Sequence, residues 1–336
     1  MISFIIIRHT MKRFLTGIKP TGDQIHLGNY FWAIKPFLQL TEQEKDSEFF
    51  LFLANMHGFT TTPSQEDLTK RSLMILKLYL ALGVDPKKVH IYNPANIPAH
   101  AQLNWVFSCL TNIGTMERMH TYKDALAKGQ MEEFWVGTFC YPILMAADIL
   151  LYDADFVPIG KDQKQHVEYA RDIAEKFNRT YGETFVIPEP LIQEAVALIP
   201  GIDGRKMSKS YNNYIGLLED EKTLLKKVKQ ISTDTKTVEE SKNPDECNLY
   251  LIGKNFLTPE EDEKWRNQFL AGGYSYKEAK DFVYEQCLNF LQSLQKKYAE
   301  ITDEEVHQML KEGENAVAEI AEKKINEVYQ KIGFIF

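Results

Sequence analysis

The chain contains little cysteine, no long apolar run and no excess of basic charge, and each shortage excludes a class of protein. Its four cysteines lie far apart in 336 residues and form no C-x-x-C pair. Neither a disulfide framework nor a structural zinc site is therefore indicated. No apolar run approaches the length of a membrane span. We expect a reduced, cytoplasmic protein without a membrane partner.

The charge balance is acidic. The chain has 39 Lys and Arg residues against 47 Asp and Glu residues, which gives a net charge of -8. A protein that coats nucleic acid is usually basic, so any contact with RNA must be a local patch. The length suffices for one large domain and a smaller one, each with its own core.

The lysine-rich segment 204–210 reads G-R-K-M-S-K-S and is the most informative stretch of the chain. Lys206 and Lys209 stand three residues apart in what we expect to be a mobile loop. Two ammonium groups with neighbouring hydroxyls and backbone N–H groups suit a polyphosphate. A generic K-x-x-K is more often an exposed basic turn, so the interpretation depends on a second motif.

That second motif is H-L-G-N at residues 26–29. Residues 14–18 predict a short strand, residues 19–24 a turn-rich loop, and His26 the opening of a helix. A glycine at such a turn lets the backbone approach a phosphate, and a helix N-terminus is electropositive. Alone, the tetrapeptide is weak evidence.

Strands and helices alternate along the first half of the chain. Residues 48–54, 89–92 and 156–160 predict further strands, residues 64–83 a capped helix, and residues 100–152 a largely helical stretch. This alternation predicts right-handed βαβ units and an α/β fold with a parallel, doubly wound sheet.

Asp148 is the unusual residue of the helical stretch. On a helix it shares a face with Leu144 and Leu151, so its carboxylate points into apolar surroundings without a nearby cation in this run. The alternative is a carboxylate at a helix edge that reaches water. Earlier in the stretch, the polar residues 124–133 predict a mobile loop.

The C-terminal part predicts helices with charged faces. Lys222, Lys226, Lys227 and Lys229 form a basic helix face, which is either merely solvated or a contact for a phosphate backbone. The last helix keeps an apolar stripe, so we expect it to pack against the rest of the protein.

Together, H-L-G-N and K-M-S-K-S, about 180 residues apart, resemble the signature motifs of class I aminoacyl-tRNA synthetases. Four further strings resemble the tryptophanyl-tRNA synthetase family: P-T-G…H-L-G-N-Y, E-R-M-x-x-x-K, Y-P-x-L-M-A-A-D-I-L-L-Y and V-P-x-G-x-D-Q-K-Q-H. The resemblance implies a Rossmann-like catalytic domain with a C-terminal helical domain. It departs from the usual family pattern at Leu15, at residues 55–58 and at Asn29, an asparagine that tryptophanyl enzymes accept.

The resemblance also implies a domain layout. Residues 1–10 would be a possible N-terminal extension, and residues 11–216 the catalytic domain with a helical insertion at about 100–152. Residues 217–300 would be a helical anticodon-binding domain, and residues 301–336 a terminal helix that packs back toward the catalytic domain.

The activity implied is the joining of L-tryptophan to tRNA(Trp) by a homodimer, with ATP and Mg²⁺. Asp148 would accept the indole N–H, and Tyr141 and Gln163 would contact the α-amino group. The implied catalytic residues are Lys206, Lys209, Lys123, His26 and Asn29. The implied ATP-binding residues are Lys19, Thr21, His26, Gly28, Asn29, Gly160, Asp162, Lys206, Met207, Ser208 and Lys209; those for tryptophan are Leu15, Tyr141, Met145, Asp148, Ile159 and Gln163. The alternatives are a tyrosyl-tRNA synthetase, a small-molecule nucleotidylyltransferase, and a non-catalytic paralogue that binds RNA or tryptophan.

Overall fold

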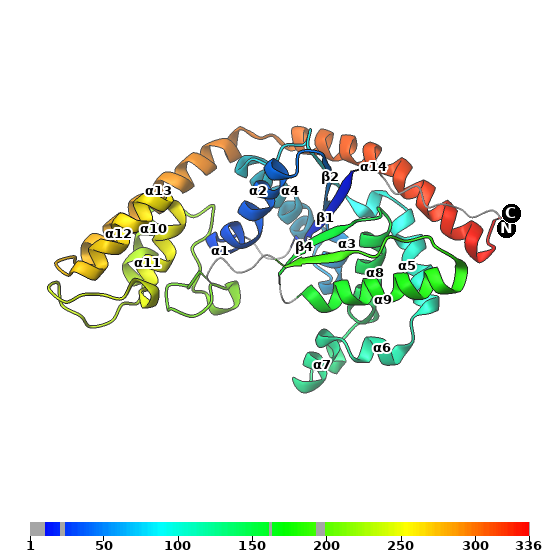
Figure 1. Ribbon diagram of the computed structural model, residues 1–336, viewed down its shortest axis with the longest axis horizontal. Coiled ribbons are helices and arrows are strands. Elements are labelled where there is room, and N and C mark those ends of the chain that lie inside the picture. Colours follow the sequence, from blue (N-terminus) through cyan, green and yellow to red (C-terminus); the bar gives the residue numbers. More distant parts are fainter. Residues whose placement is uncertain (1–10, 21–23, 161–162, 193–198, 336) are drawn as a thin grey trace.

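The computed structural model describes residues 11–20, 24–160, 163–192 and 199–335 (Figure 1). A five-stranded sheet lies at its centre, with helices on both faces, and helices α10 to α13 stand to one side of it. All pairings within the sheet are parallel. The predicted α/β fold class is therefore confirmed.

The strand order is β3-β2-β1-β4-β5. The chain runs outward from β1 to β3 and then crosses back over β1 to build β4 and β5, so the winding reverses between β1 and β4. A doubly wound sheet opens a crevice at such a reversal, at the carboxyl ends of the strands. The strands are β1 (Lys12–Ile18), β2 (Ser47–Leu53), β3 (Val89–Tyr92), β4 (Phe156–Ile159) and β5 (Glu189–Ile192).

Four of these strands follow the prediction to within a few residues. The fifth, β5, was not predicted, because Pro188 and Pro190 interrupt the apolar pattern there. A proline lacks the N–H that a central strand needs, and β5 lies at the edge of the sheet, where this costs little.

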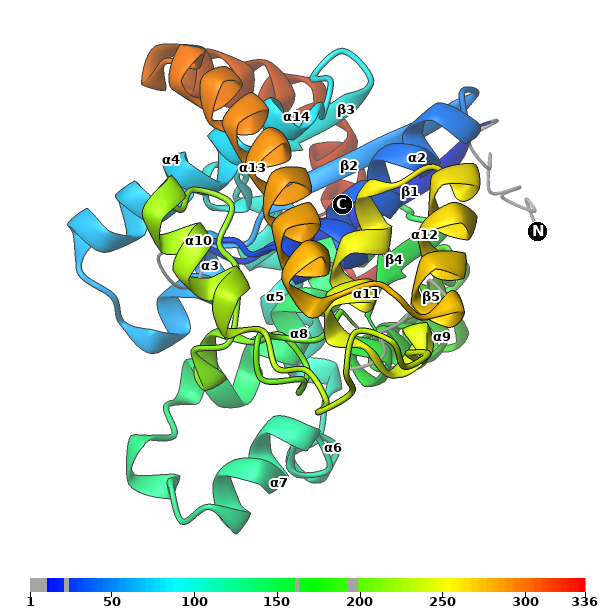
Figure 2. The same cartoon turned by 90° about the vertical axis from the view of Figure 1, so that its left-hand side faces the viewer.

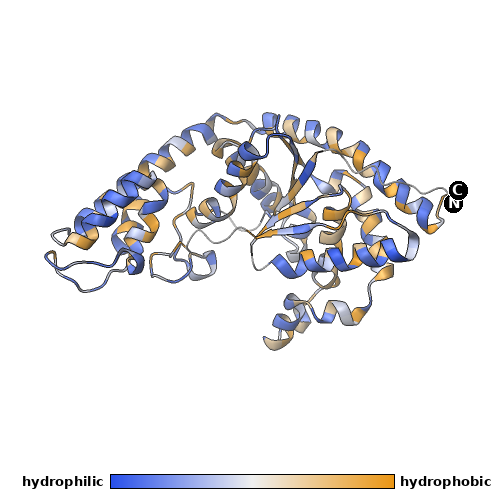
Figure 3. Ribbon diagram, in the orientation of Figure 1, coloured by the Kyte–Doolittle hydropathy of each residue, from blue (hydrophilic) through white to orange (hydrophobic). Residues whose placement is uncertain are grey.

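Both faces of the central strands are buried. Phe14 of β1 and Phe49 of β2 belong to one hydrophobic cluster, whereas Leu15, Phe50 and Phe52 belong to the other. Successive side chains of a strand point to opposite faces, so the unbroken apolar runs of β1 and β2 supply both cores. Figure 3 shows the apolar strands in the interior and mostly hydrophilic outer surfaces on the helices.

The helices have the following bounds: α1 (Leu27–Asn29), continued by a π-helical turn η1 (Tyr30–Ile34) and α2 (Lys35–Gln43); α3 (Asn55–Gly58), α4 (Gln65–Leu82), α5 (Ala99–Leu110), α6 (Ile113–Glu117), α7 (His120–Ala127), α8 (Val136–Leu150), α9 (Lys164–Tyr181), α10 (Glu221–Gln230), α11 (Asn248–Gly253), α12 (Pro259–Ala271), α13 (Tyr276–Glu300) and α14 (Asp303–Ile332). Within the described residues, no helix combines the length and the apolar character needed to cross a membrane.

The mobile loop predicted for residues 124–133 is wrong in its first part. Helix α7 continues through residues 124–127, and a short 3₁₀ turn covers residues 131–133. The reason is tertiary: Ala125 is buried, so the segment has a packed face that its polar composition does not reveal.

The last helix, α14, lies across β3 at the edge of the sheet (Figure 2). Gly313 marks the crossing, because a β-carbon there would lie 1.9 Å from the carbonyl oxygen of Ile91. On one side of this point Val306 joins the first hydrophobic cluster, and on the other Val317 and Val328 join the second. One helix thus completes both cores and covers the open edge of β3.

The basic face predicted on α10 is only partly exposed. Lys222, Lys226 and Lys229 are exposed, but the ammonium group of Lys227 is paired with Glu219 and donates a 2.7 Å hydrogen bond to the carbonyl oxygen of Tyr214. Lys227 is therefore a structural residue that joins α10 to the segment before it.

Candidate active site

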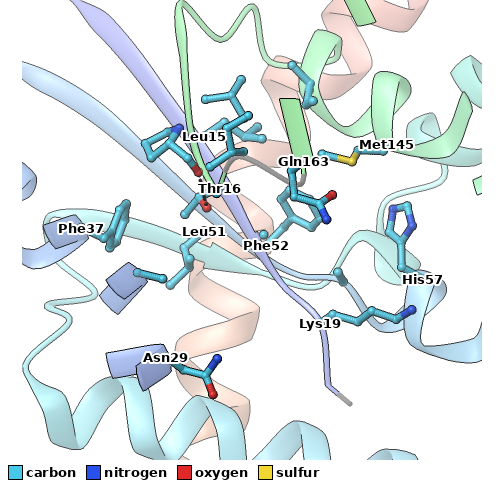
Figure 4. Close-up of a pocket in the computed structure, with 18 of the residues that line it drawn as sticks. Leu15, Thr16, Lys19, Asn29, Phe37, Leu51, Phe52, His57, Met145 and Gln163 are labelled. Atoms are coloured by element: carbon cyan, nitrogen blue, oxygen red, sulfur yellow. Dashed lines mark hydrogen bonds between the residues drawn. The ribbon is translucent and has the colours of Figure 1, made fainter. Parts of the chain in front are cut away.

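A cavity of about 760 Å³ opens at the carboxyl ends of β1 and β4, where the winding of the sheet reverses. Strand β1 contributes Leu15, Thr16 and Gly17 to its wall, and β4 contributes Pro158 and Ile159. Figure 4 shows Met145, Gln163 and His57 close together, and Asn29 well apart from them at the start of the helix that follows β1. The cavity is large enough for a nucleotide beside an amino acid.

Many of the residues singled out from the sequence meet in this cavity, although they come from distant parts of the chain. Of the other singled-out residues, Thr21 and Asp162 lie outside the described residues. Lys123 is exposed on α7 and is not part of the cavity wall. The singled-out residues that line the cavity are Leu15, Lys19, Asn29, Tyr141, Met145, Ile159, Gly160 and Gln163.

One end of the cavity is apolar and tightly built. Leu15 is fully buried in its wall, and Met145 and Ile159 are half-buried beside it. Gly17 faces the ring of Phe52 so closely that a β-carbon would lie 2.4 Å from it. Only glycine leaves this strand and the phenylalanine in place, and the apolar lining of this end suits a flat, apolar group.

Asp148 lies on α8 immediately behind this end, with a side chain that is 1% exposed. Its Oδ2 accepts a hydrogen bond from Nε2 of His57 at 2.9 Å, and its Oδ1 accepts one from Nδ1 of His100 at 2.5 Å. His57 lines the cavity, whereas His100 is fully buried, and its Nε2 lies 2.8 Å from the hydroxyl of Tyr152. The alternative of a carboxylate that reaches water is therefore wrong.

The surroundings keep Asp148 ionised. Burial alone would raise the pKa of its carboxyl group, but the charge and hydrogen bond of His100, together with those of His57, outweigh burial and hold the pKa below its ordinary value. A carboxylate has about four acceptor positions. Two are used by the histidines, so the group retains capacity for a further N–H donor.

Tyr141 also lines the cavity. Its hydroxyl lies 2.7 Å from Nε2 of His166 and 2.6 Å from the hydroxyl of Thr121. His166 is buried on α9, and Thr121 belongs to α7. Tyr141 therefore connects the cavity wall to the helix that carries Lys123.

The opposite end of the cavity is electropositive. A smaller hollow of about 210 Å³ shares Gly17, Lys19 and Asn29 with the cavity and is also lined by Lys209. Burial lowers the pKa of Lys19. It also lowers the pKa of His26 to about 4, with smaller contributions from the charges of Lys209 and Lys206. His26 is therefore neutral at pH 7, and the lysines give this end the charge that attracts a polyphosphate.

The two signature motifs are in direct contact. Met207 is buried, and its sulfur accepts a weak hydrogen bond from the backbone N–H of Gly28 at 3.3 Å. A β-carbon on Gly28 would lie 3.0 Å from the ring of His26, which itself accepts a hydrogen bond from the backbone N–H of Asn29. Glycine at position 28 thus leaves room for the ring of His26, whereas a β-carbon there would be in ordinary contact with Met207, at 3.5 Å.

The base of the lysine loop is fixed, and one of its lysines lies over an aromatic ring. The side chain of Asn213 accepts from the N–H of Ser208 and donates to Asp203 and to the carbonyl oxygen of Lys206. The ammonium group of Lys206 lies 4.7 Å from the centre of the ring of Trp32, a cavity residue. This is cation–π distance.

Comparisons with known proteins agree with this geometry. A family model described as "tRNA synthetases class I (W and Y)" matches residues 8–330. The tryptophan–tRNA ligase of Fusobacterium nucleatum is 42% identical over 328 residues, which cover 97% of this chain and 99% of that protein. The chain belongs to the tryptophan–tRNA ligases.

Another tryptophan–tRNA ligase, from Campylobacter jejuni strain RM1221, is 40% identical over 96% of this chain and 99% of its own length. The crystal structure of the C. jejuni tryptophanyl-tRNA synthetase complexed with ADP and tryptophan has a TM-score of 0.87 and covers 96% of this chain and 99% of that one. A tyrosyl-tRNA synthetase from Archaeoglobus fulgidus, at 19% identity and a TM-score of 0.67, shares the fold alone.

Three residues at the site were not identified from the sequence: Trp32, His100 and Asn213. His57 belongs to residues 55–58, polar groups at the end of a predicted strand, where α/β sheets bind ligands. Asn213 directly follows the lysine loop, and this position is the signal that could have identified it. The sequence gives no such signal for His100, because only the fold brings it into contact with Asp148.

Proposed function

We propose that the chain joins L-tryptophan to tRNA(Trp) in two steps, through a tryptophanyl-adenylate made from ATP. The observation that carries the proposal is one cavity with an apolar end backed by a buried carboxylate and a second end lined by lysines. The C. jejuni relative, whose solved structure contains ADP and tryptophan, supports the same pair of ligands.

In the first step, a carboxylate oxygen of tryptophan attacks the α-phosphorus of ATP. The new P–O bond forms as the bond to the β-phosphate oxygen breaks, and pyrophosphate leaves with that electron pair. The nucleophile is already ionised, so no general base is needed. Catalysis then consists of positioning and of stabilising charge on the pyrophosphate. In the second step, a ribose hydroxyl at the 3′ end of the tRNA takes the aminoacyl group.

The lysine end of the cavity suits the pyrophosphate. Lys209 already lines the hollow there, and Lys206 lies on the same loop. We assign His26, Gly28 and Asn29 to the nucleotide, because their helix start faces this hollow. Lys123 is the most distant member of the proposed catalytic set. Because it is exposed on α7, its role requires α7 to move toward the nucleotide, and Tyr141 is the link through which a bound amino acid would reach that helix.

The apolar end suits the indole ring. We assign Leu15, Met145 and Ile159 to its walls and Asp148 to its N–H, with Tyr141 and Gln163 near the α-amino group. A buried acceptor without its donor is costly, and such sites reject analogues that lack the donor by about 10⁴–10⁵-fold. Phenylalanine lacks this donor, and tyrosine presents its hydroxyl elsewhere.

Mg²⁺ would accompany the nucleotide. Among the described residues, no carboxylate lines the hollow, whose lining includes Lys19, Gln24, Asn29, Arg71 and Lys209. These donors do not form a protein cage for Mg²⁺, which prefers carboxylate, phosphate and water oxygens. The phosphates and water would therefore hold the ion.

We also propose that residues 217–300 face the anticodon and that the chain forms a homodimer. Lys222, Lys226 and Lys229 provide exposed positive charge in the first of these regions despite the acidic net charge. For the dimer, the support is a set of exposed apolar side chains in the helical insertion: Trp105, Ile113, Leu126, Trp135 and Val136.

Amino-acid-dependent exchange of pyrophosphate into ATP tests the proposal, with tryptophan, tyrosine and phenylalanine compared side by side. We expect exchange with tryptophan alone. Exchange with tyrosine would overturn the assignment of the apolar end. Absence of exchange with all three amino acids would overturn the catalytic function itself and point to a non-catalytic paralogue that binds RNA or tryptophan.

A further inference from the structure

A chain of buried polar groups runs from the cavity wall into the core of the protein. It begins at His57, passes through Asp148 and His100, and ends at the hydroxyl of Tyr152. The last three of these side chains are at most 1% exposed. The four residues come from α3, α5, α8 and the turn that follows α8, so the chain of contacts exists only in the folded protein.

Buried polar groups of this kind are expensive unless each one is paired. An ionised carboxylate can only accept hydrogen bonds, so both imidazoles must donate to Asp148. Nε2 of His100 lies 2.8 Å from the hydroxyl of Tyr152, so the second nitrogen of this ring is paired as well. Both imidazoles therefore direct a donor at Asp148, and each of these buried groups has a partner.

The two histidines differ in what they face. His57 lines the cavity, so a ligand can contact or displace it. His100 is sealed between α5 and α8 and touches the rings of Tyr92 and Tyr152, with ring centres 6.1 and 5.5 Å away. It cannot contact any occupant of the cavity. Its 2.5 Å contact to Asp148 is the shorter of the two histidine contacts.

We infer that His100 is a positioning residue for the recognition of the indole N–H: it holds Oδ1 of Asp148 from the side away from the cavity, so that Oδ2 is turned toward the cavity residue His57. Tyr152 pairs the other nitrogen of His100 and so fixes the orientation of the ring. The inference rests on the proposed role of Asp148 as the acceptor of that N–H.

The experiment compares two substrates on each variant in the pyrophosphate exchange assay. One is tryptophan, and the other is its isostere β-(3-benzothienyl)alanine, in which sulfur replaces the ring N–H. The quantity measured is the ratio of their kcat/KM values. Because both substrates meet the same protein preparation, the fraction of folded enzyme cancels in the ratio. A general loosening of the pocket lowers both kcat/KM values and leaves the ratio unchanged.

His100→Leu removes the donor to Asp148. We expect it to lower the ratio by about 10- to 100-fold, the usual effect of losing a hydrogen bond to a charged group, while the KM for ATP stays within about twofold. His100→Asn places an amide N–H near the position of Nδ1 and should restore most of the ratio. Tyr152→Phe should lower the ratio less than His100→Leu, because the donor to Asp148 is retained.

Asp148→Asn separates the inference from the proposal on which it rests. If Asp148→Asn lowers the ratio and His100→Leu does not, His100 is only a core residue and the inference is overturned. Failure of His100→Asn to recover the ratio would likewise overturn the positioning role. If Asp148→Asn itself leaves the ratio unchanged, the proposed N–H acceptor is wrong, irrespective of His100.

Discussion

Trp32→Leu is expected to improve the use of ATP by releasing Lys206. The ammonium group of Lys206 lies 4.7 Å from the ring centre of Trp32. Lys206 does not line the hollow assigned to the pyrophosphate, so we expect it to leave the ring when it binds there. A cation–π contact at an exposed site is worth about 0.5–1 kcal/mol. That energy is lost each time the loop engages the nucleotide. Its removal should therefore lower the KM for ATP by about two- to fivefold.

A double-mutant cycle isolates this contact, because Trp32 also lines the cavity and can touch the nucleotide directly. The KM for ATP is measured by pyrophosphate exchange in the wild type, in Trp32→Leu, in Lys206→Ala and in the double variant. We expect Trp32→Leu to lower the KM only when Lys206 is present. The same fold-change in both backgrounds would show that the ring does not hold the lysine, and the reasoning would fail.

Three further predictions follow from the site and the fold. Lys206→Ala and Lys209→Ala should each slow single-turnover adenylate formation by more than they weaken tryptophan binding, measured by rapid quench and titration calorimetry; unchanged rates in both would remove the lysines from the reaction. Gly313→Ala should destabilise the protein by about 1–3 kcal/mol in urea unfolding, because its β-carbon would meet the backbone of Ile91; the gain of about 1 kcal/mol that this change usually brings to a helix would contradict the crossing described here. The pKa of His26 is lowered to about 4 from the ordinary 6.5, so the unfolded chain binds a proton between these values that the folded protein does not; the free energy of unfolding should fall as the pH drops through this window, and His26→Asn, which keeps a side-chain cap, should fall less steeply.

The elements that carry their own pattern were predicted well from the sequence. The strands β1 to β4 are apolar runs bounded by turn residues. Helix α4 begins where Ser64 accepts a hydrogen bond from the N–H of Asp67, and it ends at Gly83, as predicted. Each of these signals lies within the element that it specifies, so it can be interpreted without knowledge of the rest of the fold. Eight of the site residues named by resemblance line one cavity.

What could not be predicted depends on partners that are distant in sequence. Asp148 looked like a carboxylate without a cation, because its own helix offers none. Its partners His57 and His100 stand 91 and 48 residues away. Similarly, Lys227 looked like part of a basic face until the fold brought it to Glu219. A periodicity describes one element at a time and does not show which charges meet.

The position of α14 has a consequence for the order in which the chain matures. Its residues from Asp303 to Ile332 contribute to both hydrophobic clusters and cover the edge of β3. During synthesis, neither core is complete until this helix has left the ribosome, although the cavity residues were all made earlier. Until then, the nascent sheet keeps an unprotected edge. The window in which this ligase is vulnerable to misassociation is therefore set by its last helix, far from the cavity.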